Sequence, residues 1–318
     1  MRGETGRRRE FPMTGVILAG LIGLPALAQP PAGVASKAPP DRLDGPPLVT
    51  AKAWAVADGK TGQLLWGVNE SESRPIASTT KIMTAWLVLR LAESDSKVLD
   101  ETIIYSERAA ATRGSSAKLQ TGDRLPVREL LFGLLLPSGN DAAVSLAEHF
   151  GGRFAANGPA GGDPLPLFVA EMNARAKALG LTATSYVDPN GLGNNRSSAR
   201  DLAVLTSHAL QNERFRKYVG TRRHEYAVTA ASGEKRTVTW ANTNKLLDVE
   251  GYEGVKTGTT TPAGNCLVAS GRRGTDHLLV VVLGASSTDG KFVEARNLFR
   301  WAWRQRGHTT DGASTRGQ

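Results

Sequence analysis

Cysteine is almost absent from this chain of 318 residues, because Cys266 is the only one. A disulfide framework within the chain and a metal site built from several cysteines are therefore excluded. Aromatic residues make up only 6% of the chain, and its five histidines never form the HExxH pair of zinc hydrolases. A Gly-x-Ser-x-Gly nucleophile elbow is also missing, which excludes an α/β-hydrolase triad. No pattern requires a cofactor, and we expect none.

The residues that are present give an ordinary soluble-protein composition, with 40% hydrophobic and 22% charged residues. This composition disfavours a disordered chain and a multi-pass membrane protein. Basic residues exceed acidic ones by 39 to 30, which gives a formal net charge of +9. The excess favours anionic partners but does not choose between nucleic acid, a polyanionic cell wall and a small carboxylate substrate.

The N-terminal 28 residues predict a secretory signal peptide. A basic stretch at 7–9 precedes an apolar run over 13–24, and the small-x-small pattern of a signal peptidase site ends at Ala28. The pair Arg8-Arg9 also fits a twin-arginine export signal, and an uncleaved anchor is the alternative to cleavage. Cleavage removes four Arg and two Glu, so the charge falls from +9 to +7.

The segments next to the expected domain are poor in large apolar residues. Residues 29–47 carry six prolines and predict an extended linker, whereas residues 307–318 predict a disordered tail. We therefore expect one folded domain at 48–306. Since the chain ends near this boundary, the predicted product is a soluble enzyme exported to the periplasm or the extracellular space.

Hydrophobic periodicity predicts strands near both ends of this domain and helices between them. A hairpin is expected at 51–57 and 63–68 around the turn 58–62, followed by a fully buried helix at 78–92. Further helices are expected at 127–136, 141–150, 165–179, 199–211 and 291–304, and further strands at 251–256, 266–271 and 277–284. Short turns between neighbouring strands favour an antiparallel sheet. The predicted class is α+β, with a sheet that joins the N- and C-terminal segments and an inserted helical lobe.

Ser-x-x-Lys occurs four times, beginning at Ser78, Ser94, Ser115 and Ser232, so the pattern alone means little. Only Ser78 opens a long apolar helix. Lys81, three positions later, shares its helix face and can reach its hydroxyl. Burial lowers the pKa of a lysine, which would make Lys81 a base able to activate Ser78. The alternative is an N-cap serine followed by a lysine whose stem lies along a buried helix.

Two further patterns place polar groups at the ends of apolar elements. Ser138-Gly139-Asn140 lies in a turn between two predicted helices, where it can face a cleft or simply cap the next helix. Lys256-Thr257-Gly258-Thr259 ends a predicted strand and offers an ammonium, a hydroxyl and an open backbone edge to a peptide. A second Lys-Thr-Gly, at 60–62, lies in the N-terminal hairpin turn and is assigned to structure.

These three patterns in this order resemble the signature of the penicillin-recognising serine enzymes. More closely, residues from about 50 to 303 are similar to the low-molecular-mass penicillin-binding proteins, the secreted serine D-alanyl-D-alanine carboxypeptidases. Other stretches that fit this family lie at 114–123, 136–143, 188–192, 197–203 and 263–268. The resemblance implies the β-lactamase/DD-peptidase-like fold and a hydrolase of cell wall biogenesis and cell shape. It also implies peptidoglycan stem peptides ending in D-Ala-D-Ala as substrates and β-lactam antibiotics as inhibitors.

The resemblance implies a catalytic role for each of five matching residues. Ser78 would be the acylated nucleophile, and Lys81 would be its general base. Ser138 and Lys256 would pass a proton to the leaving D-alanine, while Asn140 would hold the peptide carbonyl. No metal is implied.

The end of the Lys-Thr-Gly strand would bind the substrate backbone through Thr257, Gly258 and Thr259. Thr257 would hold the terminal carboxylate, and the N–H groups of Ser78 and Thr259 would form the oxyanion hole. Many relatives have His at the position of Thr259. Relatives also often carry an Arg near the closing helix, where the nearest candidate here is Lys291, which lacks the bidentate fork of an arginine.

Three alternatives remain beside a carboxypeptidase. A β-lactamase shares the fold, but no Glu-x-x-Leu-Asn stretch for its deacylating water occurs between Asn140 and Lys256. A D,D-endopeptidase would use the same site and is poorly separated by sequence. A non-catalytic wall-binding relative is disfavoured because the catalytic residues are all present. Nucleic-acid binding is disfavoured by the export signal and by the lack of a known binding motif.

Overall fold

The computed structural model of this chain describes residues 45–154 and 162–308. The predicted signal peptide at 1–28, most of the linker at 29–47 and the tail from residue 309 lie outside the described residues. The described residues all belong to one of two units of the chain, Leu43–Gln318. None of their helices is long and apolar enough to cross a membrane.

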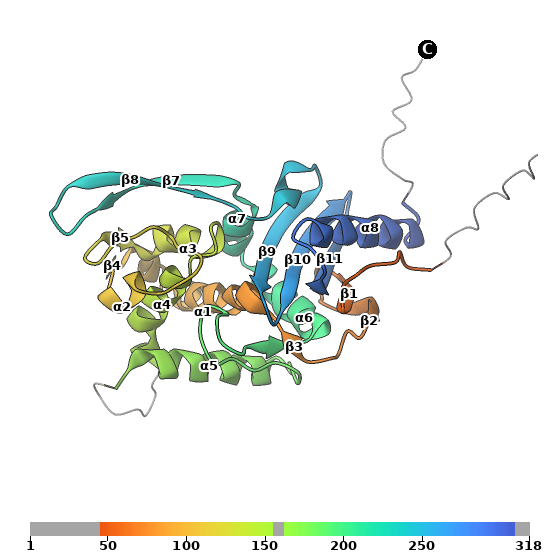
Figure 1. The fold of residues 1–318 in the computed structure, drawn as a ribbon, viewed down its shortest axis with the longest axis horizontal. Helices are drawn as coiled ribbons and strands as arrows, with labels where there is room; N and C mark the ends of the chain where they lie inside the picture. The colour runs from red at the N-terminus through yellow and green to blue at the C-terminus, as the bar shows by residue number, and fades with distance from the viewer. Residues whose placement is uncertain (1–44, 155–161, 309–318) are drawn as a thin grey trace, which may run out of the picture. The chain divides into compact units, whose positions relative to one another are not determined.

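A five-stranded antiparallel sheet joins the two ends of the described chain, as the sequence predicts (Figure 1). Its strands in spatial order are β2 (Leu64–Val68), β1 (Ala53–Asp58), β11 (Asp276–Ala285), β10 (Gly264–Arg273) and β9 (Tyr252–Thr260). Ala55 pairs with Val281, which ties the N-terminal strand to the C-terminal hairpin, and Lys256 pairs with Val268. β9 is an edge strand of this sheet, the kind of strand to which a peptide can add as a further strand.

Both faces of this sheet are buried. Successive side chains of a strand point to opposite faces, and in β11 they alternate between two hydrophobic clusters. One face is covered by α8 (Gly290–Gln305), which contributes Phe299, Trp301 and Trp303. The other face packs against α6 (Ala199–Gln211) and continues into the core of the helical lobe. Strands that are apolar at every position are typical of such a three-layer arrangement.

The helical lobe is built around α1 (Lys81–Ser94), whose residues are buried from Lys81 to Leu89. α1 contacts α6 and four further helices, α3 (Val127–Leu135), α4 (Asn140–Phe150), α5 (Pro164–Ala178) and α7 (Glu213–Gly220). Its central place explains why its sequence is apolar on almost every face.

The remaining elements are short, apart from one long hairpin. A four-stranded sheet has the order β4 (Thr102–Ile104), β5 (Arg124–Pro126), β7 (Arg223–Thr229) and β8 (Lys235–Ala241). The others are β3 (Arg74–Pro75), β6 (Arg196–Ser197), α2 (Glu107–Ala110) and the 3-10 turns η1 (Ala77–Thr80), η2 (Ser96–Asp100), η3 (Gly151–Phe154) and η4 (Lys245–Asp248).

The structure corrects the sequence prediction at two places. The buried helix begins at Lys81 rather than Ser78, because Ser78 lies in η1. The second correction concerns elements that were not predicted, namely the strands β3 to β8 and the helices α2 and α7. The other predicted helices and strands are found within a few residues of their expected bounds.

Candidate active site

The nucleophile candidate Ser78 lies in a tight turn between β3 and α1. Residues three apart eclipse each other in a 3-10 turn, so Ser78 and Lys81 face the same side even though the α-helix has not yet begun. Ala77, just before it, has φ of 48°, a conformation that favours glycine and has an energetic cost for alanine. The chain therefore reaches Ser78 through a strained bend.

Lys81 is fully buried and has three polar neighbours. Its Nζ lies 3.0 Å from Oγ of Ser78, 2.7 Å from Oδ1 of Asn140 and 2.6 Å from the backbone carbonyl oxygen of Asn190. Two of these three atoms are carbonyl oxygens, which can only accept hydrogen bonds. Only the Ser78 hydroxyl can donate a proton to Lys81.

The electrostatic surroundings of Lys81 suit a base. Burial lowers its pKa to about 7, although the carboxylates of Asp188 and Asp141 act in the opposite direction. A neutral amine has two N–H groups and one lone pair. When Asn140 and Asn190 accept the two N–H groups, the lone pair is left for the proton of Ser78.

The predicted Ser-x-Asn turn lies between α3 and α4. Ser138 has φ of 67°, and its buried Oγ has no hydrogen-bond partner among the described residues, which leaves it available to a substrate. Asn140 donates from Nδ2 to the carbonyl oxygen of Arg113 at 2.8 Å, so its Oδ1 is directed to Lys81. The carboxylate of Asp141 accepts from the backbone N–H of Ala117 at 2.9 Å and fastens the preceding loop to this turn.

The Lys-Thr-Gly pattern lies on the edge strand β9. Lys256 is buried, donates to the carbonyl oxygen of Thr257 at 3.1 Å, and has its pKa lowered well below the ordinary value, first by burial and then by Lys81 and Lys291. Because the two lysines repel each other, protonation of one disfavours protonation of the other. Oγ1 of Thr257 lies 2.6 Å from Oγ1 of Thr243.

Gly258 brings β9 against the nucleophile turn. A Cβ atom at this position would lie 3.0 Å from the backbone nitrogen of Ser78 and 3.0 Å from the carbonyl oxygen of Ile76. Glycine therefore permits a close approach that a side chain would hinder. The two backbone N–H groups expected to form the oxyanion hole belong to Ser78, which takes part in this contact, and to Thr259, which follows Gly258.

Lys291, at the start of α8, lies beside the end of β9. Its Nζ donates to Oγ1 of Thr259 at 3.3 Å, and burial lowers its pKa. The same Thr259 hydroxyl lies 2.8 Å from the carbonyl oxygen of Gly258 and 3.2 Å from Oδ1 of Asn265. Thr259, which stands where many relatives have His, is thus hydrogen-bonded to Lys291, the nearest candidate for the relatives' Arg.

The structure therefore brings the three sequence patterns together. Ser78, Lys81 and Asn140 meet directly, Gly258 touches the Ser78 backbone, and Lys256 lies within the electrostatic reach of Lys81. Ser138 lies in the same turn as Asn140, between α3 and α4. One neighbour was missed, the carbonyl of Asn190, although the stretch that contains it, 188–192, had been noted for its resemblance to the family.

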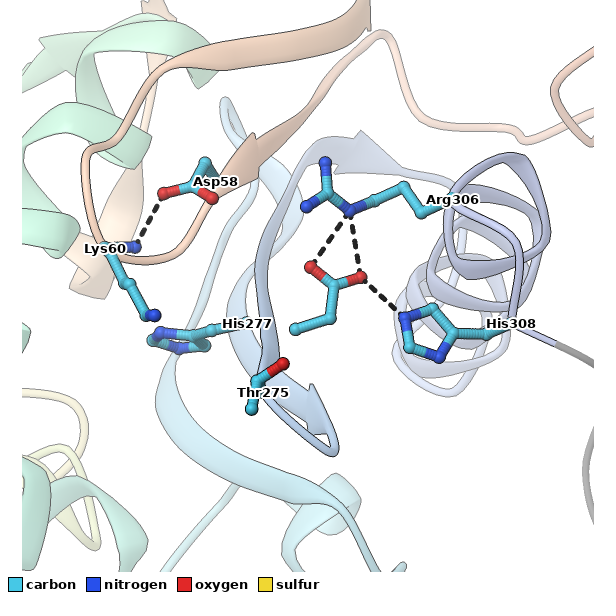
Figure 2. A pocket seen from close by; sticks show the side chains of 7 residues that line it. Asp58, Lys60, Thr275, His277, Arg306 and His308 are labelled. Atoms are coloured by element: carbon cyan, nitrogen blue, oxygen red, sulfur yellow. Dashed lines mark hydrogen bonds and ion pairs between the residues drawn. The ribbon is translucent and has the colours of Figure 1, made fainter.

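The second Lys-Thr-Gly lies elsewhere, next to a cavity of about 410 Å³ (Figure 2). Asp58 accepts from the backbone N–H of Lys60 at 3.0 Å, so this copy is a turn, as predicted. Asp276 accepts from Arg306 at 2.9 Å and lies 3.1 Å from Nε2 of His308, which fastens the end of α8 to β11. No serine or cysteine lines this cavity, and its polar groups connect elements of the fold.

Neither a metal site nor the single cysteine adds chemistry among the described residues. Within the described residues, no group of three or more His, Cys, Asp or Glu side chains could hold a metal ion. Cys266 is a buried residue of β10 with its pKa raised by burial, and a thiol in that state is a poor nucleophile.

Comparison with known proteins gives a consistent match over this region. A family model described as D-alanyl-D-alanine carboxypeptidase, peptidase family S11, matches residues 41–287. The D-alanyl-D-alanine carboxypeptidase of Streptomyces sp. (strain K15) is 34% identical over 278 residues, which cover 86% of this chain and 93% of that protein. The carboxypeptidase DacF of Bacillus subtilis (strain 168) is 33% identical and covers 80% of this chain, but only 62% of DacF is matched.

Two further comparisons bear on the activity and the fold. The D-alanyl-D-alanine endopeptidase of Pseudomonas aeruginosa is 32% identical over 301 residues, which cover 93% of this chain and 88% of that protein. The crystal structure of the Streptomyces K15 DD-transpeptidase superposes with a TM-score of 0.75 at 33% identity, covering 82% of this chain and 99% of the other. The predicted DD-peptidase-like fold is confirmed.

Proposed function

Because the chain belongs to the D-alanyl-D-alanine carboxypeptidase family, whose members are serine hydrolases, we propose that it removes the terminal D-alanine from peptidoglycan stem peptides ending in D-Ala-D-Ala. The reaction runs through an acyl-enzyme on Ser78, and β-lactam antibiotics acylate the same residue. The observation that carries the proposal is the buried Lys81, held between Ser78, Asn140 and the Asn190 carbonyl.

Acylation begins at Ser78. The lone pair of Lys81 takes the hydroxyl proton while Oγ attacks the carbonyl carbon of the penultimate D-alanine, giving a tetrahedral oxyanion. The backbone N–H groups of Ser78 and Thr259 donate to this oxyanion, and each such donor is worth about 3 kcal/mol in the transition state. Collapse breaks the peptide bond, and Ser138 with Lys256 passes a proton to the departing amine.

Substrate binding uses the open edge of β9. The peptide lies along Thr257 to Thr259 as an added strand, and Asn140 holds its carbonyl. The terminal carboxylate is bound by Thr257 in the positive field of Lys256 and Lys291. Lys81 passes the proton taken from Ser78 to Ser138 and Lys256, which replaces the one given to the amine and leaves Lys81 neutral again. Lys81 then takes a proton from a water molecule that attacks the ester on Ser78, and return of that proton to Oγ of Ser78 releases the shortened peptide.

The location of the reaction follows from the substrate. Stem peptides of the cell wall lie outside the cytoplasmic membrane, and the signal peptide predicted at 1–28 would export the enzyme to them. The mature charge of +7 then acts on a polyanionic wall.

Ser78→Ala tests the proposal directly. Labelled penicillin should acylate the wild type stably and leave Ser78→Ala unlabelled, and release of D-alanine from a D-Ala-D-Ala peptide should fall by a factor of about 10⁴ or more. Ser94→Ala is the matched control, because Ser94 begins another Ser-x-x-Lys but is exposed at the end of α1. Equal labelling of Ser78→Ala and Ser94→Ala would contradict the assignment.

An endopeptidase is the second candidate, since the Pseudomonas aeruginosa endopeptidase is similar over 93% of this chain. The same assay with a cross-linked muropeptide separates the two. Release of monomers faster than D-alanine would favour the endopeptidase, and rapid turnover of penicillin without D-alanine release would favour a β-lactamase.

A further inference from the structure

The segment that supplies the Asn190 carbonyl is folded by two side chains, Asp188 and Asn195. The carboxylate of Asp188 accepts from the backbone N–H groups of Asn190 at 2.9 Å and of Gly191 at 2.5 Å, and it also accepts from Gly193. Three backbone donors on one carboxylate wind the chain into a compact loop, as acidic residues do in turns.

Asn195 closes this loop from its other end. Its Oδ1 accepts from the N–H of Val187 at 2.7 Å, and its Nδ2 donates to the carbonyl oxygen of Asp188 at 2.9 Å. The same Nδ2 lies 3.0 Å from Oγ1 of Thr80, in the turn that carries Ser78. Asn195 is 1% exposed, so these hydrogen bonds are shielded from water.

The loop is attached at three sites to the end of η1 and the start of α1. Asn195 reaches Thr80, the Asn190 carbonyl accepts from Lys81 at 2.6 Å, and the Pro189 carbonyl accepts from Oγ1 of Thr84 at 2.6 Å. Residues three and four apart on a helix are neighbours, which allows one loop to hold all three.

We propose that Asp188 and Asn195 are positioning residues that hold the Asn190 carbonyl on Lys81 and so aim the Lys81 lone pair at Ser78. The inference rests on the proposed function, because it concerns the same base. Neither side chain touches the reacting atoms. Without the loop, Lys81 keeps one carbonyl partner, Asn140, and can rotate about that single hydrogen bond.

The charge of Asp188 has a second, separable effect. The charged groups acting on Lys81 are the carboxylates of Asp188 and Asp141 and the neighbouring Lys256. Since Asp188 favours the protonated form of Lys81, its removal makes Lys81 a weaker base that is neutral at lower pH. A purely structural role would lower the rate without moving the pH dependence in this direction.

The experiment measures the rate of acylation by labelled penicillin between pH 5 and pH 9. In the wild type the rate should rise through an apparent pKa of about 7, because Lys81 must be neutral to accept the proton. For Asp188→Asn we expect the acid limb to move about one pH unit lower and the plateau to fall about tenfold or more. For Asn195→Ala we expect a similar loss at the plateau with a smaller shift of the limb.

Asn173→Ala is the matched control. Asn173 is hydrogen-bonded to the backbone of Tyr186, at 2.9 Å and 2.8 Å, just before the loop, and its hydrogen bonds are not made to α1. It should change stability without moving the pH dependence of acylation. If Asp188→Asn does not fold, Asn195→Ser carries the test, since its hydroxyl retains part of the hydrogen bonding.

The outcomes are distinct. Plateau rates and acid limbs of Asp188→Asn and Asn195→Ala that match those of Asn173→Ala would overturn the inference. Failure of penicillin to acylate the wild type at Ser78 would instead overturn the proposed function.

Discussion

Gly191 and Ala77 meet backbone to backbone at the nucleophile. Gly191 has φ of 92°, and a Cβ atom there would lie 2.1 Å from the carbonyl oxygen of Ala77 and 2.9 Å from the nitrogen of Ser78. Both atoms belong to the backbone, so neither can turn aside as a side chain could. The shape of the Ser78 turn thus depends on the absence of a side chain 113 positions later in the chain.

Gly191→Ala should therefore displace the Ser78 turn. We expect the acylation rate to fall by a factor of about 100, because a shift of about 1 Å at a reacting group costs this much. Unfolding should also become easier by more than the ~1–2 kcal/mol that positive φ costs an alanine. Acylation rates and urea unfolding measure the two effects.

The variant Gly233→Ala separates the energetic cost of a positive φ from the effect of a steric clash of the added Cβ atom. Gly233 has nearly the same φ, 90°, but nothing lies within 4 Å of a Cβ atom at its position in the β7–β8 turn. This variant should lose about 1–2 kcal/mol of stability and keep its acylation rate. Equal acylation by both glycine variants would show that the contact with Ser78 does not matter.

Individual residues also show how much of the candidate active site could be predicted from the sequence. Spacing singled out Ser78 and Lys81, and the order of the patterns with the resemblance put Asn140 in the same predicted site, but the hydrogen bond from Lys81 to Asn140 was not predicted. The third partner of Lys81 is a backbone carbonyl, which leaves no side-chain signature at Asn190. The left-handed conformation of Ala77 could not be predicted either, because alanine disfavours positive φ and the backbone contact with Gly191 is made by a residue far away in the sequence.

At the scale of elements, strands buried on both faces were easier to predict than a half-exposed hairpin. β10 and β11 are almost continuously apolar, whereas β7 and β8 alternate buried residues such as Val228 and Trp240 with polar exposed ones. The alternation of apolar and polar residues that is typical of a half-buried strand was present in both β7 and β8. It is weak evidence where each strand has only two or three apolar positions.

His277 at the start of β11 links this strand to β10 and has a lowered pKa. It is 4% exposed, its Nε2 lies 2.8 Å from Oγ of Ser270 on β10, and the cavity of Figure 2 lies beside it. Burial lowers its pKa from 6.5 to about 4, and Arg272 acts in the same direction. The folded state therefore keeps His277 neutral at a pH at which the unfolded chain binds a proton.

The free energy of unfolding should consequently decrease in acid because of His277. The stabilisation is fully present above pH 6.5 and is lost as the pH falls from about 6.5 to about 4. At pH 5 the loss amounts to about 2 kcal/mol relative to pH 7. Urea unfolding of the wild type and of His277→Gln, which cannot titrate, should show a pH dependence that differs by this amount. Parallel curves for the two proteins would contradict the assignment of this loss to His277.

At the scale of the whole molecule, the two ends of the domain are joined twice. β1 pairs with β11, and just before β1 the buried carboxylate of Glu294 in α8 accepts from the backbone N–H of Thr50 at 2.9 Å and of Ala51 at 3.2 Å. The first of these ordered contacts lies within three residues of the predicted domain boundary at residue 48. We therefore predict that the fold needs the chain only from about Val49 onwards.

Two variants test this boundary together. Deletion of residues 1–47 should leave the acylation rate unchanged and the free energy of unfolding within about 0.5 kcal/mol of the full chain. Glu294→Ala, which leaves all residues before β1 in place, should cost about 2–3 kcal/mol, because it removes a charged acceptor from two backbone donors. Glu294→Gln should lie between them, since its amide still offers one oxygen. A larger loss from the deletion than from Glu294→Ala would place part of the folded domain within residues 1–47.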